Sequence, residues 1–153
     1  MPDGSLMRQC DIDAAMSTMH DRLICWGRLI LAGGNGPRQK WDTDDEREYH
    51  DFSPLDHDDA RRLNTWVFQL PKPQQSVTLG VFYVDDKVCS VWHQMSDIRR
   101  MEVARDLEGR INAKIRALNR GLANPWVTIR ADEVDGIRLR AIRMLVNRER
   151  VVL

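Results

Sequence analysis

The sequence predicts a mainly α-helical small domain with a helix-turn-helix, and one segment near residues 77–92 that permits a β-hairpin insertion. Apolar residues recur at spacings of three and four along several segments, which is the period of one helix face. Glycine and proline follow these segments, where a helix must end. The 153 residues suffice for one core and are too few for two large domains. We expect a flexible N-terminus over residues 1–18, a helical domain over 19–125 and a C-terminal helical extension over 126–153.

The first helix is expected between about residues 11 and 32. The run from Gly33 to Pro37 ends it, because glycine suits a C-terminal cap and proline prevents continuation. Its apolar face is formed by Met16, Met19, Leu23, Trp26 and either Leu29 or Ile30.

An acidic segment follows. Residues 42–59 hold nine acids and one base, with aromatic residues that favour a loop packed in places. The paired acids lack the alternating spacing of a calcium loop, so we expect no metal there. The last of them, Asp56, Asp58 and Asp59, suit the start of a second helix because carboxylates favour the positive end of the helix dipole. This helix would bury Leu63, Val67 and Leu70 and end at Pro71 and Pro73.

The segment after Pro73 is ambiguous. Val77, Leu79, Val81 and Tyr83 alternate as in a half-buried strand, and the β-branched and aromatic content around "VDDK" favours a hairpin. The same residues also fit a short buried helix, because periodicity does not separate the two for short apolar runs.

The basic segment "RMEVARDLEGRINAKIRALNRGL", Arg100 to Leu122, is preceded by Ser96 or Asp97 as an N-cap. One apolar face precedes Gly109 and another follows it, and Gly121 and Pro125 end the segment. A final amphipathic helix is expected through Ile137, Ile142 and Leu145, because acids precede it and bases close it. The apolar faces of the basic segment are Ile98, Met101 and Ala104 or Leu107, then Ile111, Ile115, Leu118 and Leu122.

Two interpretations of the basic segment remain open. One is a helix-turn-helix at about residues 97–122 that bends at Glu108-Gly109-Arg110, with its second helix in the major groove of DNA. The other is a continuous or kinked surface helix with charged flanks. In the first, arginine would read guanine edges, asparagine would read adenine edges, and the remaining bases would contact phosphate. The predicted DNA-binding residues are Arg99, Arg100, Arg110, Asn112, Lys114, Arg116, Asn119 and Arg120.

The remaining features argue against catalysis and cofactors. The four histidines follow no metal or nucleophile–base spacing, and "AGGNGPR" has neither phosphate-loop pattern. Cys10, Cys25 and Cys89 are far apart in the sequence and odd in number, so we expect reduced thiols in the cytoplasm and no structural zinc. No apolar run reaches the length of a membrane helix, and the N-terminus lacks the apolar region of a secretory signal. We expect no enzyme activity, cofactor, metal site or membrane association.

The net charge of zero hides an uneven distribution. Residues 1–60 hold 13 acids and 6 bases, whereas residues 61–153 hold 10 acids and 17 bases. The halves therefore carry balances of −7 and +7. Such a division arises from two solvated faces of one fold, or from an anionic partner for the basic half and a basic protein surface for the acidic half.

The order of motifs resembles phage antitermination proteins of the Q type, in the branch whose core is similar to region 4 of sigma factors. The resemblance covers about Asp21 to Leu122. Its pieces are "DRLICWGRLILAGGNGPR", "DDARRLNTWVFQLPK", "VTLGVFYV" and "VARDLEGRINAKIRALNRGL". About ten extra residues precede the last piece, and its turn is Glu108-Gly109-Arg110 instead of Leu-Gly-Ile. The resemblance favours a helix through Tyr83.

The resemblance implies a phage late-gene transcription antiterminator in the host bacterial cytoplasm. It would bind double-stranded DNA near a late promoter, join bacterial RNA polymerase paused nearby and travel with it past terminators. The alternative from the charge pattern is a non-catalytic protein-interaction module of phage origin with oppositely charged halves. A small nuclease is a third alternative.

Overall fold

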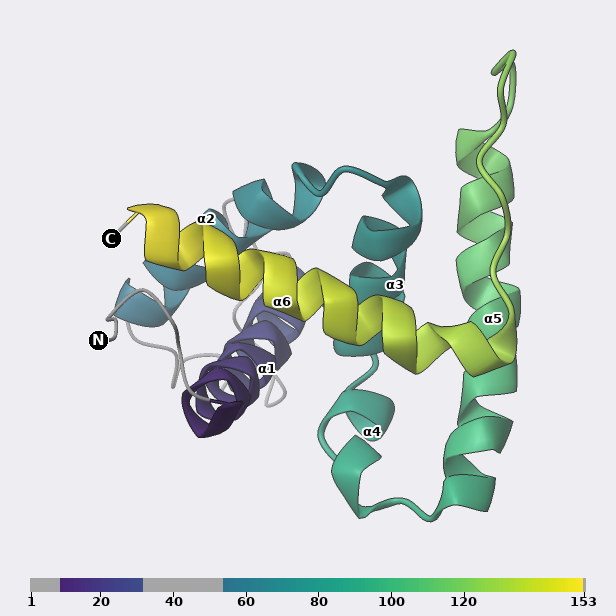
Figure 1. Ribbon diagram of the computed structural model, residues 1–153. Helices are drawn as coiled ribbons and strands as arrows, with labels where there is room; N and C mark the ends of the chain where they lie inside the picture. The colour runs from purple at the N-terminus through teal and green to yellow at the C-terminus, as the bar shows by residue number, and fades with distance from the viewer. Residues whose placement is uncertain (1–8, 32–53, 153) are drawn as a thin grey trace, which may run out of the picture.

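The computed structural model describes residues 9–31 and 54–152. Every regular element in this part of the chain is helical, which confirms the prediction of a mainly α-helical domain. Figure 1 shows their arrangement. The elements are α1 (Gln9–Leu31), α2 (Pro54–Phe68), α3 (Pro73–Val84), α4 (Asp86–Cys89), the 3-10 turn η2 (Trp92–Gln94), α5 (Asp97–Leu118), the 3-10 turn η3 (Ala131–Glu133) and α6 (Val134–Val152).

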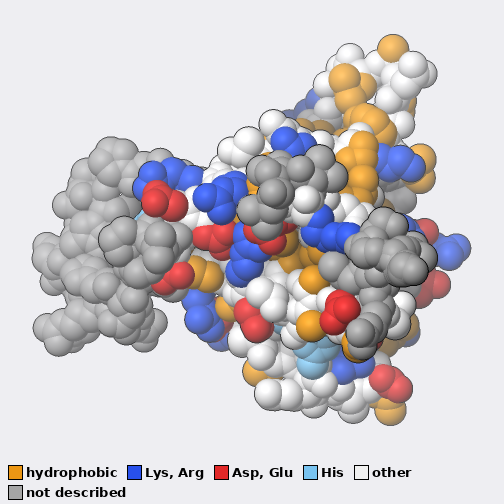
Figure 2. All heavy atoms as spheres, turned by 60° about the vertical axis from the view of Figure 1, so that its left-hand side comes forward, with side chains coloured by type: hydrophobic (Ala, Val, Ile, Leu, Met, Phe, Trp, Pro, Cys, Tyr) orange, Lys and Arg blue, Asp and Glu red, His pale blue; other side chains and the backbone are white. Residues whose placement is uncertain are grey.

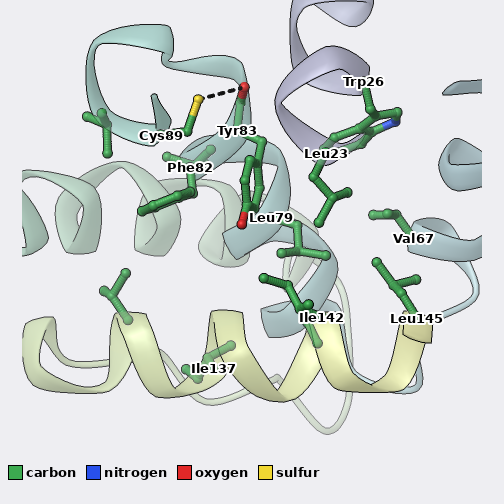
Figure 3. Close-up of a cluster of buried hydrophobic side chains, with 14 of the residues drawn as sticks. Leu23, Trp26, Val67, Leu79, Phe82, Tyr83, Cys89, Ile137, Ile142 and Leu145 are labelled. Atoms are coloured by element: carbon green, nitrogen blue, oxygen red, sulfur yellow. Dashed lines mark hydrogen bonds between the residues drawn. The ribbon is translucent and has the colours of Figure 1, made fainter. Parts of the chain in front are cut away.

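Helix α3 lies at the centre of the core and packs against α1, α5 and α6. It begins after Pro71 and Lys72, with Pro73 in its first turn, where the missing N–H costs no hydrogen bond. Figure 3 shows its side chains meeting those of α1 and α6. The labelled residues in this cluster include Leu79, Phe82 and Tyr83 of α3, Leu23 and Trp26 of α1, and Ile137, Ile142 and Leu145 of α6.

The hairpin allowed near residues 77–92 is wrong, because α3, α4 and η2 occupy this segment and the described residues contain no strand. Helix α3 is covered by other helices on several sides, so Leu79, Val81, Phe82 and Tyr83 are all buried although they do not share one face. A helix that is buried nearly all round loses the periodic pattern that identifies it. The helix implied by the resemblance was therefore the better prediction for this segment.

The domain boundaries also differ from those expected. Helix α1 begins at Gln9, inside the segment expected to be flexible. Helix α6 crosses the domain from α5 towards α2 (Figure 1) and buries Ile137, Ala141, Ile142 and Leu145 in the same core as α1 and α3. Residues 134–152 are thus part of the domain rather than an extension of it. Most of the acidic segment over 42–59 lies outside the described residues, and Asp56 stands in the first turn of α2 as expected.

Helix α5 is continuous from Asp97 to Leu118, so the predicted bend at Glu108-Gly109-Arg110 and the helix-turn-helix built on it are wrong. Ser96 caps the start of α5 by accepting a hydrogen bond from the N–H of Arg99, as predicted. Of the apolar faces expected on either side of Gly109, Ile98 and Met101 are exposed, whereas the buried residues form one stripe across Gly109. Val103, Leu107, Ile111 and Ile115 follow at intervals of four, and all are buried.

The backbones of α1 and α3 approach closely at Gly27. A Cβ atom at this position would overlap the backbone carbonyl of Tyr83. Neighbouring Trp26 and Leu29 are buried, so α1 cannot turn this side away without exposing them. Gly27 therefore sets the distance between the two helices, and a side chain there would separate them.

We expect Gly27→Ala to destabilise the domain by about 3 kcal/mol, at the upper end of the usual cost of overpacking, because the clash is with backbone atoms. Urea unfolding followed by circular dichroism measures this change. The control is Gly80→Ala in α3, where a Cβ meets nothing within 4 Å, and which should be neutral or stabilising. Equal effects of the two substitutions would contradict the close approach.

A substitution at Gly109 distinguishes a continuous α5 from a turn at this position. In a helix, Gly109→Ala should raise the free energy of unfolding by about 0.5–1 kcal/mol, because alanine favours the helix and a Cβ there meets nothing within 4 Å. Gly121 has φ 79°, so Gly121→Ala should lower it. Thermal melts of the two variants test this, and a loss of stability in Gly109→Ala would restore the bend.

Candidate functional site

The C-terminal half of α5 and the chain that returns from it form an arm. We define the arm as residues 112–130. In Figure 1 the arm rises beyond the other helices, and the returning chain runs back along α5 to η3. Residues 125–130 have no regular structure, and among residues 119–130 only Ile129 is buried and Asn119 half-buried. The arm is therefore the part of the described chain most open to a partner.

Two asparagines of α5 hold the returning chain. The Asn112 amide donates to the carbonyl of Ile129 and accepts from its N–H, both at 2.8 Å. The Asn119 amide bonds the carbonyl and N–H of Trp126 in the same way, both at 2.7 Å. Seven residues of helix rise about 10.5 Å, and three residues of extended chain span about 10 Å. The two spacings match, so both pairs form together.

Asn112 and Asn119 are consequently not free to read adenine edges, as the sequence had suggested. Each amide uses one N–H and its carbonyl oxygen on backbone groups of the arm, and Asn112 is buried. Breaking the Asn112 pair would leave the buried N–H and C=O groups of Ile129 without partners, which is costly, whereas the Asn119 pair is exposed. Their role in this fold is structural.

Arg100 and Arg110 are also engaged within the fold. Arg100 donates to the carbonyls of Trp92 and His93 at 2.9 and 3.0 Å, which fixes η2 against α5. Arg110 donates to the carboxylate of Asp85 at 3.0 and 3.2 Å. These two arginines of the predicted DNA-binding set therefore hold neighbouring elements.

The other predicted residues project from α5 and the chain after it. Arg99 is exposed beside Glu102 at 3.4 Å, a pair worth little in solvent. Lys114, Arg116 and Arg120 are exposed and make no ion pair with any described residue. Arg105, which was not in the predicted set, lies on the same side of the helix as Arg116. We call the side of α5 away from the core the outer face; it carries Glu102, Arg105, Asp106, Gly109, Ala113, Arg116 and, just past the helix end, Arg120.

The arm and the turn of helix below it contain no acid. From Gly109 to Ala131 the sequence has five bases and neither aspartate nor glutamate. Only Arg110 and Arg130 of these bases have carboxylate partners in the described chain. The field around the arm is therefore positive and attracts an anionic partner.

A buried polar cluster lies on the other side of the core, where α1, α3 and α6 meet. Arg138 is 1% exposed, and it donates to the hydroxyl of Tyr83 at 2.9 Å and to Asp135 at 2.7 and 2.9 Å. The Tyr83 hydroxyl lies 2.7 Å from Nδ1 of His20. Since the hydroxyl oxygen accepts from Arg138, its proton is directed at His20, which places the proton of a neutral His20 ring on Nε2.

The charges in this cluster shift two titrations. Burial and then the positive charge of Arg138 lower the pKa of His20 to about 4. Burial raises the pKa of the Tyr83 hydroxyl, so this group stays protonated. The Arg138 guanidinium pairs with Asp135 and lies 4.8 Å from the centroid of the Phe82 ring. Its charge is therefore compensated within the fold. Nothing in the pattern of the last helix distinguished Arg138 from its exposed neighbours, so sequence reasoning missed this cluster.

A cavity of about 360 Å³ adjoins the cluster. His20 and His93 both line it, with their rings in edge contact and their centroids 4.9 Å apart, and Asp13 and Ser17 of α1 also line it. Asp135 already compensates the nearby guanidinium, and Asp13 adds a negative charge, so the cavity does not have the net positive charge that an anion site needs. The described residues contain no group of three or more histidine, cysteine or acidic side chains that could hold a metal ion.

The cysteines lie apart, and no two of them form a disulfide. Burial raises the pKa of Cys25 and of Cys89 to about 11 in each case, so neither is a thiolate near neutral pH. The Cys89 thiol donates to the carbonyl of Tyr83 at 3.7 Å (Figure 3). Both behave as packing residues.

Comparisons with known proteins add no relative: no family model, curated protein or solved structure matches this chain. Within the described residues, no helix combines the length and apolar character that crossing a membrane requires. The arm is therefore the candidate functional site on the strength of its own geometry and charge.

The low pKa of His20 makes stability depend on pH. The unfolded chain takes up a proton near pH 6.5, whereas the folded domain resists it until about pH 4. The free energy of unfolding should therefore fall, by on the order of 2 kcal/mol, as pH drops from 7 to 4. Urea titrations at pH 4, 5, 6 and 7 should show a shallower fall in His20→Gln than in the parent. His57→Gln in α2 is the control, and identical pH dependence in all three proteins would refute this role of His20.

Proposed function

We propose that this protein is a DNA-binding transcription regulator of the phage antitermination type. The observation that supports it best is the run without acids from Gly109 to Ala131, displayed on an arm whose outer face carries arginines that meet no carboxylate of the described residues. Duplex DNA is the anionic polymer that such a surface suits, because neutralised phosphates release condensed counterions.

The contact would differ from a helix-turn-helix. An α-helix is about 10–12 Å wide and the major groove about 12 Å, so the outer face of α5 fits the groove as a single rod. Gly109 and Ala113 keep the rod narrow between Arg105 and Arg116. The arginines reach the phosphates on the groove walls. Since Asn112 and Asn119 are engaged with the arm, choice of sequence rests on few base contacts or on DNA shape.

Binding of RNA polymerase is carried into this proposal by the resemblance to antitermination proteins. In such a mechanism DNA contact delivers the regulator to a paused polymerase, and a second surface holds it there during elongation. The opposite charge balances of the two halves of the sequence would suit partners of opposite charge for these tasks. Such a mechanism consists of binding steps and needs no catalytic residue from this chain.

Salt dependence of duplex binding tests the proposal. Fluorescence anisotropy with a labelled duplex of about 20 base pairs should give affinity that falls linearly on a log–log plot between about 50 and 200 mM salt. Arg116→Gln with Arg120→Gln should weaken binding and reduce the slope by about two, because two phosphate contacts are lost. The matched control removes two exposed bases from α2, Arg61→Gln with Arg62→Gln, and should keep the parental slope.

Two results would replace the proposal. A lack of duplex binding at the lowest salt would favour a non-catalytic protein-interaction module, which the opposite charge of the halves also supports. Cleavage of the duplex on adding a divalent metal would instead favour a nuclease.

A further inference from the structure

The apolar stripe of α5 runs farther than the core that covers it. Ile111 and Ile115 are fully buried, but Leu118, one turn farther on the same stripe, is 51% exposed. Leu122, just past the end of the helix, is 47% exposed. The spacing of four and three keeps Ile111, Ile115 and Leu118 in one row of the helix, and Leu122 follows in the chain after the turn at Gly121. The helix therefore carries an apolar surface beyond the last element of this domain that packs on it.

The returning chain widens this surface. Trp126 is 39% and Val127 74% exposed beside the end of α5. Figure 2 shows hydrophobic side chains along the projecting part of the molecule, with basic side chains next to them. We call Leu118, Leu122, Trp126 and Val127 the arm tip. Single exposed apolar residues are ordinary, whereas several gathered on one projection mark an interaction surface.

The arm tip is already ordered in the free protein. The Asn119 pair fixes Trp126, and the Gln74 side chain of α3 donates to the carbonyl of Val127 at 2.9 Å. A partner that binds here would not have to order the chain, so little of its binding free energy is lost to entropy.

The charges beside the tip indicate what covers it. Arg110 pairs with Asp85 at 3.0 Å on one flank of the stripe. Lys114 stands one turn farther along the same flank, and no carboxylate of the described chain meets it. A second arm would bring like charges together, which is destabilising, so an acidic partner is favoured over self-association.

The covered part of the stripe indicates the form of that partner. Below the tip, the side chains of α5 that face the core are packed by two other helices, α3 and α6. A helix laid on the tip would continue the same packing. We propose that the arm tip docks an acidic amphipathic helix of another protein. This surface lies on the core side of α5 and the proposed DNA contact on its outer face, so the docking does not depend on DNA binding.

Synthetic peptides of about 18 residues, roughly five helical turns, provide the probe. The first has leucines on one helical face and glutamates on its flanks. The second replaces the glutamates with lysines, and the third keeps the composition but scatters the leucines. Nitrogen-15 NMR of the full chain should show shifts at the arm tip, including the Trp126 indole, with the first peptide alone. The shifts should weaken as salt rises.

Leu122→Ser with Val127→Ser should weaken binding of the first peptide at least about tenfold. The matched control removes two exposed apolar residues from the first turns of α5, Ile98→Ser with Met101→Ser, and should bind as the parent does. Melting curves of both variants check that the fold is intact.

Equal binding of all three peptides, or none, overturns the docking proposal. So does an equal loss in the control variant. Duplex DNA that displaces the peptide and shifts the same tip resonances would assign the tip to nucleic acid and overturn it as well. Failure of duplex binding in the anisotropy experiment, with the peptide still bound at the tip, would reject the proposed function and leave the docking intact.

Discussion

The fold depends on the contact between the end of α3 and its neighbours α1 and α6. Gly27 lets the two backbones meet at the carbonyl of Tyr83, and the phenol of the same residue extends to His20 and Arg138. One residue thus joins three helices, through its backbone on one side and its hydroxyl on the other. The free energy of burying a guanidinium is offset only if every partner is in place. This requirement selects one packing of α6 over α3 where apolar side chains alone would allow several.

The position of α5 follows from that core. Helix α3 packs on the lower part of α5, α6 crosses at its side, and Arg100 and Arg110 fix η2 and Asp85 to it. The upper part of the helix then extends past the domain, and only the returning chain accompanies it. An arm of this kind keeps its charges and its apolar end away from the helices of the core.

The sequence predicted the structure correctly where a local pattern is compatible with only one conformation. The apolar face of α1, Leu63 and Val67 of α2 and the Ser96 cap follow from local rules, and the structure has them, whereas Leu70 is half-buried beyond the end of α2. The prediction failed where the same local pattern is compatible with two conformations. The alternation in "VTLGVFYV" fits a strand and also fits a helix that is buried on several sides, and the segment is a helix. Gly109 allowed a turn, but it lies inside a helix whose apolar stripe continues across it.

The candidate site shows the same limit. Exposure of Arg116 and Arg120 follows from their place on the helix, so the sequence could identify them. The engagement of Asn112 and Asn119 depends on backbone groups 17 and 7 positions away in a chain that folds back on them, and no local pattern contains that information. The cluster of His20, Tyr83 and Arg138 joins residues from three distant helices for the same reason.

The asparagine pairs have a consequence for recognising relatives of this protein. Helix α5 and the extended returning chain differ in rise per residue. The asparagine side chains of the helix bond the returning chain at two positions, Asn112 at Ile129 and Asn119 at Trp126. A single insertion between the asparagines, or between Trp126 and Ile129, would displace one pair by a full residue. A lineage that keeps the arm must therefore conserve intervals of seven and three residues there, while the amino acids between them diverge. These two conserved intervals can persist after the overall sequence similarity between relatives has been lost.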